Sequence, residues 1–371
     1  MKKLGFGFMR LPQTDADDWK SIDIPLLKQM VDAFIKKGFT YFDTAYMYHL
    51  GVSEDALKQT VVERFPRSSF TVADKSPVWL VERHGDFQKY FDEQCTRLGV
   101  DYIDYYMLHA LNELTYLSTE KYDGFDFMKR IKAEGKAKHI GLSYHDNAEV
   151  LDRILTAHPE TDFVQLQINY ADWDSESIES RKCYEVAVRH KTPVIVMEPI
   201  KGGSLANPPK DVLELFKKHS PNASAASWAI RYAASLDNVF MVLSGMSTPL
   251  QLADNIGYME AFKPLDNEER AIVVKAAKII TENTAIPCTA CQYCVENCPQ
   301  NIPIPKYFSL FNDRKRFENA NPIYYSTLTQ TFGKASDCIA CGQCQKHCPQ
   351  HIDIIECMKE VSRVFDVPSA F

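Results

Sequence analysis

The stretch Gly38-Phe39-Thr40-Tyr41-Phe42-Asp43-Thr44-Ala45-Tyr46-Met47-Tyr48 starts with a glycine and runs through aromatic residues to a polar end. Helical patterns precede and follow it, at Leu26–Lys37 and Ser53–Arg64. Glycine often ends a helix, and strands buried on both faces are apolar without alternation, so Phe39–Asp43 is predicted to be a strand between two helices. This order of elements is typical of an α/β fold.

The same alternation continues outward over residues 1–282. Further runs predicted to be strands are Leu4–Phe8, Phe70–Lys75, Ile103–His109, Ala137–Ser143, Phe163–Ile168, Pro193–Glu198 and Val239–Ser244. Eight strands with intervening helices predict a (β/α)8 TIM barrel. The alternative is a doubly wound sheet, although no strand is followed by the three-glycine fingerprint of dinucleotide-binding folds.

The amino-acid composition changes after residue 282, where cysteine, proline and asparagine become frequent. Pro287, Pro299 and Pro303 interrupt any long helix there. We therefore expect two domains: the barrel over residues 1–282, which ends in a helix Asn267–Glu282, and a small, mostly helical module over residues 283–371.

Composition narrows the classes of function. The net charge of −7 argues against nucleic-acid binding. No apolar stretch approaches the ~20 residues that a membrane helix needs, and the first apolar run ends at Arg10, too early for a signal peptide. The cysteines number eleven and crowd toward the C-terminus. This pattern favours a cytoplasmic chain that binds metal over a secreted disulfide scaffold.

The C-terminal cysteines form a repeat with one spacing, C-x2-C-x2-C-x3-C-P. The repeat comprises Cys288, Cys291, Cys294 and Cys298, and then Cys338, Cys341, Cys344 and Cys348. This is the spacing of bacterial ferredoxins, where the fourth cysteine of each run ligates the other cluster. We therefore expect two [4Fe-4S] clusters, one held by Cys288, Cys291, Cys294 and Cys348, the other by Cys338, Cys341, Cys344 and Cys298. Zinc ligands or reduced structural thiols are the alternatives.

Polar residues stand at the ends of three consecutive predicted strands, where barrel enzymes keep their chemistry. Asp43 ends one strand and Tyr48 follows in the next loop; Lys75 and His109 end the next two strands. Each residue alone has an ordinary structural interpretation, such as a helix cap or core packing. Their joint placement favours a catalytic site.

In this context the sequence resembles the aldo/keto reductase family over residues 1–282. The matching stretches are residues 38–48, Ala73–Ser76, Asp101–His109 and His139–Ser143, and Leu4–Leu11 is similar to the family's first strand. The resemblance implies NAD(P)H as hydride donor, a small aldehyde, ketone or alcohol as substrate, and a catalytic tetrad of Asp43, Tyr48, Lys75 and His109.

The chemistry fits these roles. Hydride transfer to a carbonyl leaves an alkoxide that must be protonated, and Tyr48 would be the general acid. A nearby Lys75 ammonium is expected to lower the pKa of Tyr48. Asp43 would hold Lys75, and His109 would orient the carbonyl.

The resemblance also implies cofactor-binding residues. They are Met9, Arg10, Ser143, Gln167, Met197, Pro199, Ile200, Gly202, Gly245, Ser247, Gln251 and Asn255. NADPH-preferring members carry Lys and Arg where this chain has Gly245 and Gln251. We therefore expect NADH to be used at least as well as NADPH.

Two other functions remain open. The chain could be an electron-transfer protein that couples a ferredoxin-type partner to the nicotinamide, or a nucleotide-sensing or interaction module. We expect the cysteine-rich module to pack against the barrel without being an obligatory electron carrier in carbonyl reduction.

Overall fold

The computed structural model describes residues 2–282, 285–288, 294–295, 298–316, 323–348 and 350–366. Among the predicted site residues, Cys291 lies outside the described residues.

The N-terminal part is a closed barrel of eight parallel strands in sequence order. They are β1 (Leu4–Gly7), β2 (Tyr41–Asp43), β3 (Thr71–Ser76), β4 (Ile103–Leu111), β5 (Ala137–Tyr144), β6 (Phe163–Gln167), β7 (Val194–Met197) and β8 (Val239–Gly245). β1 pairs with both β2 and β8 in parallel register, which closes the sheet. The predicted (β/α)8 barrel is confirmed, and the doubly wound alternative is excluded.

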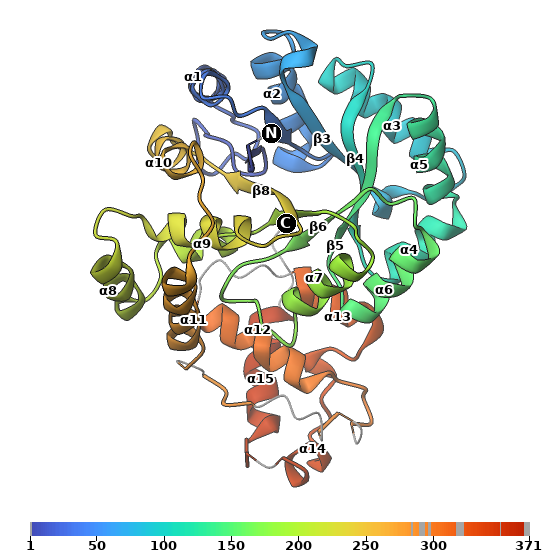
Figure 1. The fold of residues 1–371 in the computed structure, drawn as a ribbon. Coiled ribbons are helices and arrows are strands. Elements are labelled where there is room, and N and C mark those ends of the chain that lie inside the picture. Colours follow the sequence, from blue (N-terminus) through green and yellow to red (C-terminus); the bar gives the residue numbers. More distant parts are fainter. Residues whose placement is uncertain are drawn as a thin grey trace.

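Helices surround the strands (Figure 1). They are α1 (Ile24–Lys36), α2 (Ser53–Leu57), α3 (Asp86–Leu98), α4 (Glu113–Lys121), α5 (Gly124–Ala133), α6 (Ala148–Ala157), α7 (Ser180–Arg189), α8 (Lys210–His219), α9 (Ala225–Ala234), α10 (Pro249–Met259) and α11 (Asn267–Glu282). The helix predicted over Ser53–Arg64 is shorter, because a π-helical turn replaces it at Lys58–Val62. There the Thr60 hydroxyl bonds the Ala56 carbonyl oxygen, a contact that often bends helices.

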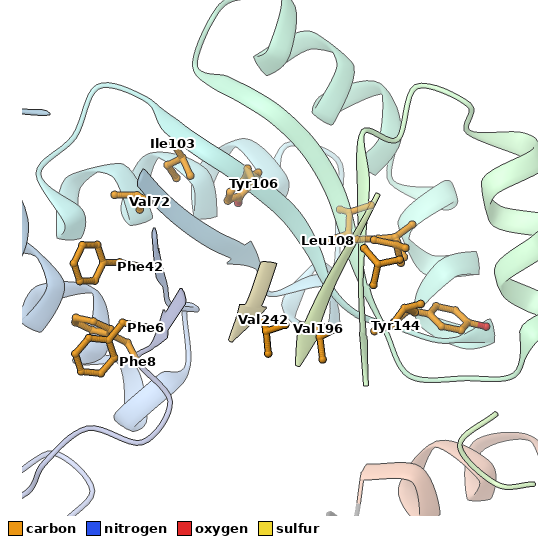
Figure 2. Packing of buried hydrophobic residues seen from close by; sticks show 14 of the residues in the cluster. Phe6, Phe8, Phe42, Val72, Ile103, Tyr106, Leu108, Tyr144, Val196 and Val242 are labelled. Carbon is orange, nitrogen blue, oxygen red and sulfur yellow. The ribbon is translucent and has the colours of Figure 1, made fainter. Parts of the chain in front are cut away.

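The core lies in two layers. Between strands and helices, Phe6 packs edge-on against Phe34 and lies beside Phe42, with Phe8 close by (Figure 2). Inside the barrel, side chains from several strands fill the space, as in TIM barrels generally. Gly5 is needed here, because a Cβ at this position would come within 2.8 Å of the Leu243 side chain.

The C-terminal module is mostly helical, as predicted. Its helices are α12 (Ile304–Arg316), α13 (Ile323–Thr331), α14 (Gln343–Lys346) and α15 (Ile354–Phe365). Ile178, from the loop after β6, belongs to the module's apolar core. The Ser177 hydroxyl donates to that of Ser309 on α12 at 3.1 Å. The module therefore packs against the barrel, with α14 at its far end (Figure 1).

Helix α11 packs against α8 and α9 in a shared apolar cluster, so it covers the barrel. The domain division at residue 282 stays a prediction. No helix in the described part of the chain is long and apolar enough to cross a membrane.

Candidate active site and cysteine sites

The carboxyl ends of the strands surround a cavity of about 550 Å³. Asp43, Tyr48 and His109 all line it, although they come from three separate segments. Lys75 does not line the cavity; its side chain is fully buried behind that wall. The structure thus brings the four predicted catalytic residues together in two layers.

Tyr48 follows β2 in a loop that a buried histidine holds in place. The Leu11 N–H donates to Nε2 of His49 at 3.1 Å, and Nδ1 of His49 lies 2.7 Å from the Trp19 carbonyl oxygen. Both contacts are met when Nδ1 carries the proton and Nε2 accepts. His49 has a φ of 50°, in the left-handed region, and these bonds hold that turn beside Tyr48.

Lys75 Nζ donates to Asp43 Oδ1 at 2.5 Å and to the Thr44 carbonyl oxygen at 2.7 Å. It lies 4.8 Å from the centre of the Tyr48 ring. Burial by itself lowers the pKa of Lys75, but Asp43 and Tyr48 oppose this, and the net pKa lies above its ordinary value. Lys75 is therefore an ammonium at neutral pH.

The pKa of Tyr48 departs from the expectation. Lys75 lowers it, as expected, but burial raises it by more and Asp43 adds to the rise. The net pKa is above the ordinary value of a phenol. Lys75 thus lowers the pKa of Tyr48 as predicted, but the prediction considered the neighbouring charge and not the loss of solvent, which has the larger effect.

His109 lies on β4, between two aromatic side chains. Its ring is 5.9 Å from that of Tyr48 and 5.0 Å from that of Trp79. Burial, with smaller effects of Lys75 and His145, holds its pKa well below 6.5, so the imidazole is neutral. β4 continues to Leu111, two residues beyond the predicted end at His109, with a register shift between Leu108 and Leu111.

The predicted cofactor-binding residues, except Gln167, line the same cavity. Gln167 is buried and donates from Nε2 to Asp172 Oδ2 at 3.0 Å, while its Oε1 has no hydrogen-bond partner in the described part of the chain. Gly202 and Gly203 follow β7 with φ of 64° and 103°, a backbone suited to close approach by a phosphate. These features fit a dinucleotide.

The cavity is also lined by residues that were absent from the prediction, among them His145, Glu198 and Ile323. His145 stands two residues after Ser143 at the end of β5, a position that could have been noticed. Burial lowers the pKa of His145 to about 4, so it is neutral. Ile323 belongs to the C-terminal module, and no sequence signal places it beside the barrel strands.

The described cysteines of the repeat surround two separate cavities. Cys298 lines one with Cys338, Cys341 and Cys344, and the other is lined by Cys288, Cys294 and Cys348. This is the crosswise grouping expected from the spacing. In the described ranges, no group of three or more His, Cys, Asp or Glu side chains is arranged to hold a single metal ion.

Comparison with known families gives two matches. Residues 3–278 match the model of the "Aldo/keto reductase family", and residues 287–352 match that of the "4Fe-4S dicluster domain". A probable aldo-keto reductase 1 of Glycine max is 30% identical over 272 residues, which cover 68% of this chain and 72% of the relative. The NADH-specific methylglyoxal reductase of Escherichia coli is 24% identical over 260 residues, covering 59% and 78%.

Solved structures share the barrel. An aldo-keto reductase from Bacillus halodurans in its holo form has 21% identity and a TM-score of 0.59, covering 74% of this chain and 91% of that one. An aldo-keto reductase from Klebsiella pneumoniae in complex with NADPH has 20% identity and a TM-score of 0.57, covering 74% and 90%.

Proposed function

Because this chain belongs to the aldo/keto reductase family and carries a 4Fe-4S dicluster domain after its barrel, we propose that this oxidoreductase reduces an aldehyde or ketone with NAD(P)H, or oxidises the alcohol. The observation that carries the proposal is the meeting of Tyr48 and His109 in one cavity, with a buried ammonium behind them. Both side chains can reach a substrate oxygen placed between them.

The nicotinamide supplies the hydride when it is bound. Tyr48 is the general acid: its hydroxyl donates a proton to the oxygen of the former carbonyl, and it takes that proton back in the reverse direction. The Lys75 ammonium stabilises the phenolate that this donation leaves. Asp43 keeps Lys75 charged and in place, and neutral His109 orients the carbonyl by a hydrogen bond.

Different residues would hold different parts of a bound dinucleotide. Ser143 would hold the carboxamide, with Gln167, which is buried outside the cavity lining, as a second candidate, and Met9 and Met197 would lie against the nicotinamide. Pro199, Ile200 and Gly202 would follow the pyrophosphate. The adenosine end would be held by Arg10 and by residues on and after β8: Gly245, Ser247, Gln251 and Asn255.

The module holds two [4Fe-4S] clusters in this proposal. Cys298 joins Cys338, Cys341 and Cys344, and Cys348 joins the three cysteines of the first run, Cys288, Cys291 and Cys294. The grouping of the described thiols around two cavities supports this assignment.

A second function is favoured by the surface of the module. Cys341 is exposed, and the neighbouring Ile339 has 60% of its surface accessible. A cluster beside this loop would lie close to solvent, where a ferredoxin-type partner could exchange single electrons. Carbonyl reduction itself needs only a hydride, so this exchange would be an additional activity.

Tyr48→Phe tests the main proposal. It removes the proton donor and little else, so turnover of a carbonyl substrate with NAD(P)H should fall about 10²–10⁴-fold while the cofactor Kd stays nearly unchanged. The matched control is Tyr46→Phe in the same loop, whose hydroxyl bonds Glu93 instead; it should keep its turnover. Near-normal turnover in Tyr48→Phe would refute the assignment of Tyr48 as the general acid. Turnover that requires an added one-electron carrier would favour the second function.

A further inference from the structure

Four charged side chains from the barrel and the module form a buried cluster where the two parts meet. Lys201 Nζ lies 2.5 Å from Asp172 Oδ1 and 3.2 Å from Asp313 Oδ2, and Asp313 also pairs with Arg316. Asp172 and Lys201 belong to the barrel; Asp313 and Arg316 belong to α12. None of these side chains is more than 14% exposed.

On the barrel side, this cluster contacts residues beside the proposed cofactor cavity. Oδ2 of Asp172 accepts hydrogen bonds from Nε2 of Gln167 at 3.0 Å and from Nδ2 of Asn169 at 2.7 Å. Because Nε2 of Gln167 binds Asp172, the Oε1 atom of the same amide points away from Asp172. Lys201 stands between Ile200 and Gly202, both of which line the cavity, and it has a φ of 48° that its ion pairs hold.

On the module side, the cluster leads to a cysteine loop. Asn312, the neighbour of Asp313, binds both backbone groups of Ile286: the Ile286 N–H donates to Oδ1 at 2.8 Å, and Nδ2 donates to the carbonyl oxygen at 2.9 Å. Ile286 is two residues from Cys288. One turn of α12 therefore holds the start of the first cysteine run and the barrel lysine together.

One ion pair joins the charges of the two parts. Asp172 pairs with Lys201 within the barrel and Asp313 pairs with Arg316 within α12, and the contact of Lys201 with Asp313 links these two pairs. Burial lowers the pKa of Lys201, but Asp172 and Asp313 raise it by more, so the ammonium persists. Neutralising Asp313 removes the carboxylate that Lys201 and Arg316 share and leaves the buried cluster with an excess positive charge.

We propose that Asp313 of the module is a positioning residue for the nicotinamide cofactor, acting through Lys201 and Asp172. The inference rests on the proposed function in that the cavity takes NAD(P)H. It makes the cysteine-bearing module a part of the cofactor site, so that dinucleotide affinity depends on how α12 is seated, with no electron transfer required.

The test is the affinity of the iron-loaded full-length protein for NADPH and NADH, measured by calorimetry or nicotinamide fluorescence. Asp313→Asn should raise the Kd for both by about 5-fold or more, the lower range of couplings between sites. Its iron content should stay that of the wild type, and kcat at saturating cofactor should change less than KM. Lys201→Arg should keep the affinity, because a guanidinium can bind both carboxylates.

Glu356→Gln is the matched control. It removes a carboxylate of the same module from an exposed pair with Lys359 and should leave both Kd values unchanged. If Asp313→Asn does not fold, the double variant Lys201→Met/Asp313→Asn removes one charge of each sign and keeps the cluster neutral; it should show the same loss of affinity.

Wild-type affinity in folded, iron-loaded Asp313→Asn, or in the Lys201→Met/Asp313→Asn double variant, would overturn the inference. A protein that binds NAD(P)H in an Asp313-dependent way but reduces no carbonyl would refute the proposed activity and leave this inference standing. A wild type that binds neither dinucleotide would refute both.

Discussion

Lys75 Nζ and Asp43 Oδ1 lie 2.5 Å apart on adjacent strands, and their side chains are 0% and 3% exposed. Both side chains are therefore largely shielded from water, with Asp43 in the wall of the cavity and Lys75 behind it. Two buried charges that compensate each other are tolerated, but either one alone is strongly unfavourable. Removing either residue should therefore lower the stability of the protein as well as the proposed activity.

Asp43→Ala should lower the free energy of unfolding by about 3–5 kcal/mol, because it leaves the Lys75 ammonium buried without its partner. Chemical denaturation of the barrel, followed by tryptophan fluorescence at fixed iron content, measures the change. Glu260→Ala is the control, since it breaks the exposed pair with Lys37 and should cost about 1 kcal/mol or less. Equal losses in the two variants would contradict the buried pair's role.

The pH dependence should differ between the two directions of the reaction. Burial raises the pKa of Tyr48 above its ordinary value of about 10 and holds that of His109 well below 6.5. Between about pH 6.5 and 9, Tyr48 then stays protonated and His109 neutral. Reduction should be flat over this range. Alcohol oxidation needs the phenolate and should rise about tenfold per pH unit. A midpoint near pH 7 in kcat/KM for reduction would argue against these two groups.

The ends of the strands could be predicted to within two residues, because glycine and proline mark the boundaries of apolar runs in the local sequence. The crosswise grouping of Cys298 with Cys344 was also predictable, since the spacing repeats. Whether Lys75 lines the cavity or lies behind it depends on register and barrel curvature, which no local pattern records. The contact of Asp313 with Lys201 could not be predicted, because it joins residues 112 positions apart. The place of Ile323 in the cavity lining also depends on how the module packs, which no local pattern records.

The pKa values in the site show the same limit of prediction from sequence. Charges near Tyr48 could be inferred from the strand ends, and the direction of the Lys75 effect on its pKa was right. The larger effect of burial comes from the surrounding structure, and the sequence does not give its size. Gln167 was placed on the nicotinamide by resemblance, yet its amide nitrogen is held by Asp172.

The cysteine grouping predicts which substitutions act on the same cluster. Anaerobically prepared protein should contain about eight irons per chain, as two cubanes require. Cys298→Ser and Cys341→Ser come from different runs but line one cavity, so each should lose about four irons from the same cluster. Electron paramagnetic resonance of the reduced protein identifies which signal remains. Different remaining signals would contradict the crosswise assignment.

Cys357→Ser is the control for these variants. This cysteine packs against the apolar core of the module and lines neither of the two cavities among the described residues. Its iron content should equal that of the wild type. Stoichiometric zinc in place of iron would refute the clusters altogether.

We expect cofactor choice to depend on a cation that the family resemblance did not single out for this role. Among the described residues that line the cavity, Arg10 is the one Lys or Arg side chain. It lies beside the adenosine-end residues: a Cβ on Gly245 would meet the Arg10 Cβ at 3.1 Å, and the Ser247 hydroxyl donates to the Arg10 carbonyl oxygen at 3.0 Å. We propose that Arg10 meets the 2′-phosphate of bound NADPH, because Gly245 and Gln251 carry no charge.

We expect NADH to be used at least as well as NADPH, and NADPH binding to depend on Arg10. Arg10→Gln should weaken NADPH about tenfold or more, the usual loss for a hydrogen bond between charged groups, and change the Kd for NADH less than about twofold. Titration of both dinucleotides decides this, with Arg83→Gln at an exposed site as control. Lys201 is a poor substitute, since its ammonium already binds Asp172 and Asp313. A strong NADPH preference that survives Arg10→Gln would show that the 2′-phosphate lies elsewhere.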